Sequence, residues 1–105
     1  MEIKGSVAVI TGGGNGIGEA VAKYFISNGA KVVIVDMAQK NIDRVVGEIR
    51  AMGGEVIGVQ ANVSSEAETA KFYKAAIDAF GQVNIVVSCA GIIRDGTMLS
   101  LDKET

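Results

Sequence analysis

A glycine-rich stretch near the N-terminus has the spacing that points most directly to chemistry. Residues 11–18 read Thr-Gly-Gly-Gly-Asn-Gly-Ile-Gly. Glycines let a backbone approach a phosphate closely and adopt positive φ angles without a clash at Cβ. An apolar segment precedes the stretch and a helix-period pattern follows it. The free N–H groups and the dipole at a helix N-terminus would bind a diphosphate in that position.

The spacing of the glycines narrows the kind of phosphate site. It fits G-x-x-x-G-x-G, with Gly12, Gly16 and Gly18, whereas G-x-G-x-x-G would require a glycine where Ile17 stands. A P-loop is excluded because no Gly-Lys-Ser/Thr follows. A glycine turn that binds no ligand is the alternative, although each glycine costs roughly 0.5–1 kcal/mol of backbone entropy.

An acidic residue, Asp36, closes the second apolar segment. A carboxylate there can accept hydrogen bonds from both ribose hydroxyls of NAD, and it would repel the 2′-phosphate of NADP. The next residues are Met37, Ala38 and Gln39, with no arginine among them, and Asn15 in the glycine stretch is uncharged. These features favour NAD over NADP. A strand-end aspartate that caps the following helix is the alternative.

Four short apolar runs predict the strands that position these residues. They are β-branched and nearly continuous, which indicates strands covered on both faces. The runs are Val7–Ile10, Val32–Val35, Val56–Val59 and Val83–Val87.

Helix-period segments lie between the predicted strands, and glycines end them at Gly29, Gly53 and Gly81. The first runs from Ile17 to about Asn28, with an apolar stripe of Ile17, Ala20, Val21, Tyr24 and Phe25. The second carries Ile42, Val45, Val46 and Ile49, and the third runs from a capping box at Ser65 and Glu68 to Phe80. The order β-α-β-α-β-α-β predicts an α/β fold with a parallel sheet.

Composition excludes several classes of function. The 105 residues carry a net charge of −2, which gives no electrostatic case for nucleic acid. No apolar run approaches the length of a membrane span, and no signal peptide is recognisable. A single cysteine and no histidine argue against a disulfide and a metal site, and a single cysteine fits a cytoplasmic protein.

The chain resembles the short-chain dehydrogenase/reductase family along nearly its whole length. The resemblance rests on residues 11–18, Asp36, Asn62-Val63 and Ser88-Cys89-Ala90-Gly91, each at the end of a predicted strand. The family usually has Asp-Val and Asn-Asn-Ala-Gly at the last two places, so this chain departs from its pattern there. The resemblance implies a Rossmann-type doubly wound sheet with strand order 3-2-1-4, of which residues 1–105 form the N-terminal portion within a single domain.

The resemblance also implies an NAD site. Asn62-Val63 would hold the adenine, and Ala90-Gly91 would pass near the cofactor ribose. Cys89 is interpreted as a small buried residue rather than a nucleophile, since the chain has no histidine to partner it. The implied cofactor-binding residues are Gly12, Gly14, Asn15, Gly16, Ile17, Gly18, Asp36, Met37, Asn62, Val63, Cys89, Ala90 and Gly91.

No catalytic residue is assigned. The family uses a Tyr-x-x-x-Lys pair with a serine, but Asn28 lies four residues after Tyr24 and Ile77 four after Tyr73. We therefore expect the chain to be the N-terminal half of a longer reductase. By resemblance, that enzyme is a homodimer or homotetramer whose remaining segment completes the site.

The substrate is a carbonyl or secondary alcohol by resemblance. The segment from Ala90 to Leu99 is similar to 3-oxoacyl-[acyl-carrier-protein] reductases, which act on acyl thioesters. NAD-linked 3-hydroxyacyl-CoA or hydroxysteroid dehydrogenases are the alternative. From other classes, an S-adenosylmethionine-dependent methyltransferase or a non-catalytic nucleotide-binding module remains open, although the methyltransferase normally has an acid where Thr11 stands.

Overall fold

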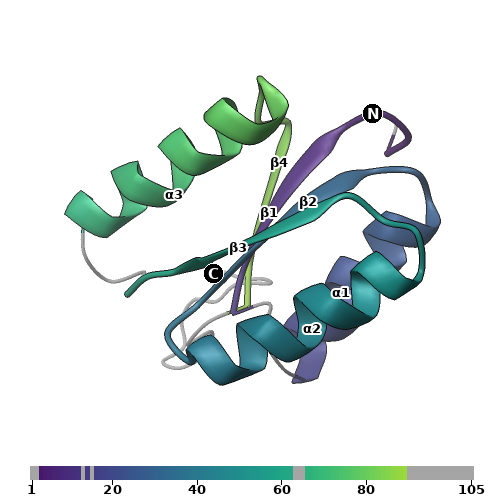
Figure 1. The fold of residues 1–105 in the computed structure, drawn as a ribbon. Coiled ribbons are helices and arrows are strands. Elements are labelled where there is room, and N and C mark those ends of the chain that lie inside the picture. Colours follow the sequence, from purple (N-terminus) through teal and green to yellow (C-terminus); the bar gives the residue numbers. More distant parts are fainter. Residues whose placement is uncertain (1–2, 13, 15, 63–65, 90–105) are drawn as a thin grey trace.

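Four parallel strands form one sheet in the order β3-β2-β1-β4 (Figure 1). The computed structural model describes residues 3–12, 14, 16–62 and 66–89. The strands are β1 (Val7–Thr11), β2 (Lys31–Asp36), β3 (Val56–Gln60) and β4 (Ile85–Ser88). The helices are α1 (Gly16–Ser27), α2 (Gln39–Ala51) and α3 (Glu66–Phe80). The predicted α/β fold and its strand order 3-2-1-4 are confirmed.

The helices cover both faces of the sheet. Helices α1 and α2 lie on one face and α3 on the other (Figure 1). Successive side chains of a strand point to opposite faces, so Ala8 and Ile10 of β1 enter the core under α1 and α2, while Val9 enters the core under α3. All five residues of β1 are buried, as the continuous apolar runs predict.

The strand register brings the ends of the strands to one edge of the sheet. Thr11 lies opposite Val35 on one side and Ser88 on the other, and Asp36 lies opposite Gln60. The glycine stretch follows Thr11 directly. Residues from four separate parts of the sequence therefore meet at the carboxyl edge of the sheet.

The predicted apolar stripe of α1 is wrong in part. Its members Ile17, Ala20 and Tyr24 are exposed, whereas Val21 and Phe25 pack against the core. The helix instead buries Gly18 and Ala22. Small residues let a helix approach the sheet closely, and a pattern of hydrophobicity cannot identify a buried glycine.

Strand β4 begins two residues later than the apolar run predicts. The backbone N–H of Asn84 donates to the carbonyl of Val7 at 2.9 Å, and its side-chain Oδ1 accepts from the N–H of Val7 at 2.8 Å. The Asn84 side chain thus takes a bond that a strand backbone would otherwise make.

No helix among the described residues is both long enough and apolar enough to cross a membrane.

Candidate functional site

The chain leaves the sheet at Gly12 and turns toward α1. The N–H of Gly12 donates to the carbonyl of Val35 at 2.6 Å, which continues the ladder between β1 and β2 by one more bond. The φ angle of Gly12 is +73°, a region that residues with a Cβ rarely adopt. Gly12 is thus required for the turn itself.

Gly14 lies against the end of β2 and the first turn of α2. Its N–H donates to Oδ2 of Asp36 at 3.0 Å. A Cβ at Gly14 would lie 2.7 Å from the same oxygen and 3.0 Å from Cβ of Asn41. A glycine is therefore needed here for close approach between the loop and Asp36.

Gly16 starts α1 and faces open space. Its φ angle is +54°, and among the described residues no atom beyond its chain neighbours and the backbone of α1 lies within 4 Å of an added Cβ. The first N–H groups of α1 have no partner within the helix, and they carry the positive end of its dipole. Open space beside a helix N-terminus is what a bound diphosphate requires, so the loop fits the group that the sequence predicts. The neighbouring Ile17 is exposed and Gly18 is buried.

Asp36 joins the glycine loop to the start of α2. Its Oδ1 accepts from the N–H of Ala38 at 3.0 Å, while Oδ2 accepts from Gly14. The N-cap residue of α2 is Ala38, so the alternative in which Asp36 itself caps the helix is wrong. An ionised carboxylate has about four acceptor positions, and two backbone bonds leave capacity for the hydroxyls of a ribose.

Arg44 of α2 also contacts the glycine loop, and sequence reasoning missed it. Its Nη2 donates to the carbonyl of Gly14 at 3.2 Å and to Oε1 of Glu19 at 2.9 Å. The residues that directly follow Asp36 in sequence include no arginine, and Arg44 is farther along the chain in α2. Arg44 lies 30 residues beyond Gly14, and its one local signal is the i, i+4 spacing to Glu48.

Glu19, in the first turn of α1, lies at the centre of an ion-pair network. Arg44 and Lys23 both donate to its carboxylate and lower its pKa to about 2. The same two cations pair with Glu48 of α2, whose pKa is also lowered. The network ties α1 to α2 beside the glycine loop.

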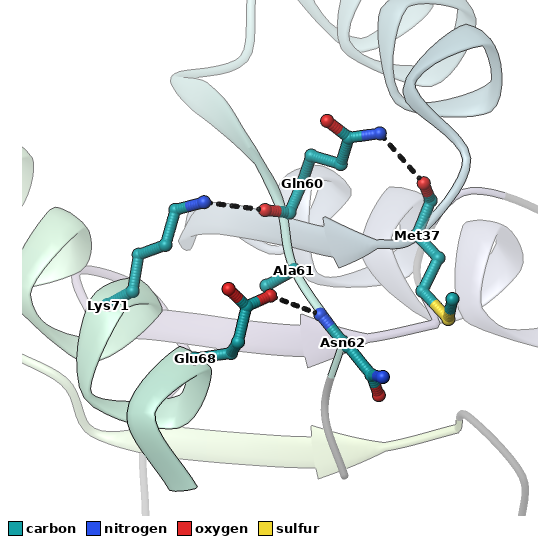
Figure 2. A pocket seen from close by; sticks show the side chains of 6 residues that line it. All are labelled: Met37, Gln60, Ala61, Asn62, Glu68 and Lys71. Carbon is teal, nitrogen blue, oxygen red and sulfur yellow. Dashed lines mark hydrogen bonds between the residues drawn. The ribbon is translucent and has the colours of Figure 1, made fainter. Parts of the chain in front are cut away.

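A pocket of about 300 Å³ opens where β3 ends (Figure 2). It brings Met37 and Asn62, both predicted cofactor residues, to one place. Gln60 donates from Nε2 to the carbonyl of Met37 at 3.0 Å, and the N–H of Asn62 donates to Oε1 of Glu68 at 2.7 Å. The residues that line the pocket are Met37, Gln60, Ala61, Asn62, Glu68 and Lys71.

Cys89 follows β4 and is half-buried. Its N–H donates to the carbonyl of Thr11 at 2.9 Å, so it lies at the same edge of the sheet as the glycine loop. Burial raises the pKa of its thiol above the usual value. A protonated thiol is a poor nucleophile, which supports its interpretation as a small packing residue.

The structure brings most of the predicted residues to one edge of the sheet. Four lie outside the described residues, and so does Ser65 of the predicted capping box. The four are Asn15, Val63, Ala90 and Gly91.

Together, the strand order and the helices on both faces define a Rossmann-type α/β protein. The chain belongs to the short chain dehydrogenase family, whose model matches residues 6–105. This membership removes the methyltransferase alternative.

Individual relatives differ in what they are named for. The chain is 49% identical over 102 residues to the peroxisomal hydratase-dehydrogenase-epimerase of Neurospora crassa, covering 97% of this chain and 11% of that protein. It is 43% identical over 100 residues to a 3-oxoacyl-[acyl-carrier-protein] reductase of Synechocystis, covering 93% of this chain and 40% of that protein.

Solved structures give the same fold. A short chain dehydrogenase/reductase from Burkholderia phymatum in complex with NAD superposes with a TM-score of 0.80 at 43% identity, over 82% of this chain and 31% of that chain. A 7α-hydroxysteroid dehydrogenase complexed with NADH and 7-oxo glycochenodeoxycholic acid gives 0.78 at 35% identity, over 81% and 33%. The chain thus spans 11–40% of the length of these four relatives.

Proposed function

We propose that the protein carrying this chain is an NAD-dependent oxidoreductase. It transfers a hydride between the nicotinamide of the cofactor and a carbonyl or secondary alcohol. The observation that carries the proposal is the open side of Gly16 at the N-terminus of α1, next to a glycine loop that Asp36 holds from β2. Family membership supplies the reaction class.

Each part of the described site has a role in this proposal. The N-terminus of α1 binds the diphosphate, Asp36 binds the adenosine ribose, and the pocket beside Met37 and Asn62 receives the adenine. Val63, Ala90 and Gly91 stay predictions from the family pattern. When bound, NAD supplies the hydride acceptor, and this chain binds and orients it. The catalytic serine, tyrosine and lysine are expected elsewhere in the protein.

NAD is proposed over NADP because of Asp36. Its carboxylate accepts from Gly14 and Ala38 and so lies fixed beside the loop, where a 2′-phosphate would meet its negative charge. Two of the structural relatives are described with NAD or NADH. Both observations favour the unphosphorylated cofactor.

Replacing Asp36 tests this preference. Asp36→Ala should weaken NAD more than NADP, because the ribose bonds and the repulsion of the 2′-phosphate disappear together. The loss of the Gly14 bond weakens both cofactors, so the measured quantity is the ratio of their dissociation constants. Asp36→Asn, which keeps the shape and removes the charge, should move the ratio in the same direction. An unchanged ratio in both variants would refute the assignment.

The substrate is proposed to be a 3-oxoacyl thioester of acyl-carrier protein. The run from Ala90 to Leu99 supports it, and one relative is named for this activity. A 3-hydroxyacyl-CoA or hydroxysteroid substrate is the alternative, favoured by the relative named a hydroxysteroid dehydrogenase. The candidates are separated by measuring how fast the whole protein turns over acyl-carrier-protein thioesters, CoA thioesters and hydroxysteroids. Faster turnover of a CoA thioester or a hydroxysteroid than of the acyl-carrier-protein thioester would overturn the proposed substrate.

We further propose that residues 1–105 belong to one dehydrogenase domain, and that the whole protein is a cytoplasmic homodimer or homotetramer. The family resemblance supports the single domain and the oligomer. The single cysteine among these residues supports the cytoplasm, although one relative is named as peroxisomal. Light scattering coupled to size exclusion of the whole protein measures the oligomeric state. A monomer would contradict the proposal.

A further inference from the structure

We propose that Arg44 is a positioning residue that holds the glycine loop in the shape required for the cofactor diphosphate. The inference rests on the proposed function and deepens it. It assigns a role to a residue that lies outside the glycine stretch in sequence and on a different helix.

The geometry singles out one residue of the loop, Gly14, whose backbone is bound on both sides of its Cα. The N–H of Gly14 is bound to Asp36, and its carbonyl is bound to Arg44. Both side chains come from the β2–α2 part of the chain, at the strand end and in the second turn of the helix. Gly14 is buried between them, and a Cβ would not fit beside Asp36. The backbone of Gly14 is therefore held through its N–H on one side of the Cα and through its carbonyl on the other.

Arg44 fixes the loop relative to α1 as well as to α2. Its guanidinium binds Glu19 in the first turn of α1 at 2.9 Å and Glu48 of α2 at 3.4 Å. A planar guanidinium holds its partners in a rigid fork, which a lysine ammonium cannot do. The carbonyl of Gly14 and the first turn of α1 are therefore held by a single group.

A fixed loop binds a diphosphate more tightly than a mobile one. The N–H groups of the loop and of the first turn of α1 must point at the phosphates together, and ordering them on binding would cost affinity. Arg44 orders them before the cofactor arrives. Its loss should therefore reduce affinity for ligands with a diphosphate and spare ligands without one.

Lys23 provides a matched control. Like Arg44, it bridges Glu19 and Glu48 and so ties α1 to α2. Among the described residues, its ammonium donates to these two carboxylates and not to the loop. Lys23→Met should lower thermal stability to a similar extent as Arg44→Met without disturbing Gly14.

The test measures dissociation constants of NAD, ADP-ribose and adenosine for the whole protein, with calorimetry for the first two and saturation-transfer NMR for adenosine. Arg44→Met should weaken NAD and ADP-ribose by about tenfold, as expected for loss of a charged hydrogen bond. Adenosine binding should change by less than about twofold on the same scale. Lys23→Met should leave all three affinities near those of the wild type.

Arg44→Lys serves as the second variant, in case the methionine variant does not fold. Lysine keeps the positive charge but lacks the planar guanidinium, so this variant should lose less affinity for NAD and ADP-ribose than Arg44→Met does. Equal effects of the Arg44 and Lys23 variants, or an equal loss for adenosine and ADP-ribose, would show that Arg44 is merely structural. A wild type that binds neither NAD nor ADP-ribose would refute the proposed function, and this inference with it.

Discussion

Two glycines of the loop are required for opposite physical reasons. At Gly14 there is no room for a side chain, because Asp36 and Asn41 occupy the space. At Gly16 the described residues leave space for a side chain. A glycine is required there because of the positive φ angle and because the proposed diphosphate would occupy that space. The first glycine positions the loop, whereas the second keeps the cofactor site open.

Gly16→Val tests the second reason. The branched side chain should abolish NAD binding, because it enters the space proposed for the diphosphate. Calorimetry of the whole protein with NAD measures the effect.

Gly53→Val is the control for backbone strain. Gly53 follows α2 with a φ angle of +86°, and in the described part of the chain an added Cβ would meet nothing within 4 Å. Both substitutions place a β-branched residue at positive φ, at a cost of roughly 1–3 kcal/mol each. Gly53→Val should lower the free energy of unfolding and leave the affinity for NAD unchanged. Normal NAD binding by Gly16→Val would refute the proposed pose.

At the scale of single residues, the sequence predicted those residues that a short local pattern identifies. Gly12, Gly16 and Asp36 follow from spacing, because each occupies a fixed distance from a strand end. Arg44 could not be predicted, since its contact with Gly14 depends on the angle at which α2 packs beside α1. Its side chain looks in the sequence like any charge on an exposed helix face.

Ion pairs connect helices α1 and α2 beside the glycine loop. Glu19 accepts from Lys23 and Arg44, and a fifth of its side-chain surface is exposed. Exposed ion pairs usually contribute little, but two cations on one carboxylate form a network. We expect a contribution of about 1 kcal/mol to the free energy of unfolding, at the upper end for exposed pairs.

Glu19→Gln should reveal this contribution as a dependence on pH. The folded-state pKa of about 2 lies below the ordinary value of 4.5, so the stabilisation is present above pH 4.5 and is lost as the pH falls toward 2. Thermal melts of wild type and variant should differ at pH 7 and converge as the pH falls below 4.5. High salt should also reduce the difference at pH 7. A difference that grows on acidification would contradict the assignment.

The elements were predictable where hydrophobicity alone decides them. Strands β1, β2 and β3 were found to within one residue at each end, since buried parallel strands are continuous apolar runs. Strand β4 starts later because the Asn84 side chain replaces a backbone bond. The buried face of α1 centres on Gly18 and Ala22, whose close packing carries no hydrophobic signal.

In the whole molecule, the site lies where the winding of the sheet reverses. From β1 the chain moves outward through β2 to β3, and then crosses to β4 on the other side of β1 (Figure 1). Ligands of open α/β sheets bind outside the carboxyl ends of the strands at such a point. The glycine loop follows β1 at this position, with Asp36 and Cys89 on its two sides.

The central claim is that this edge of the sheet binds NAD, and stabilisation of the whole protein by ligands tests it most directly. NAD at about 100 times its dissociation constant should raise the free energy of unfolding by about 2.7 kcal/mol. NADP at the same concentration should stabilise less, and S-adenosylmethionine should have no effect. Stabilisation by S-adenosylmethionine but not by NAD would contradict the account, as would equal stabilisation of wild type and Gly16→Val by NAD.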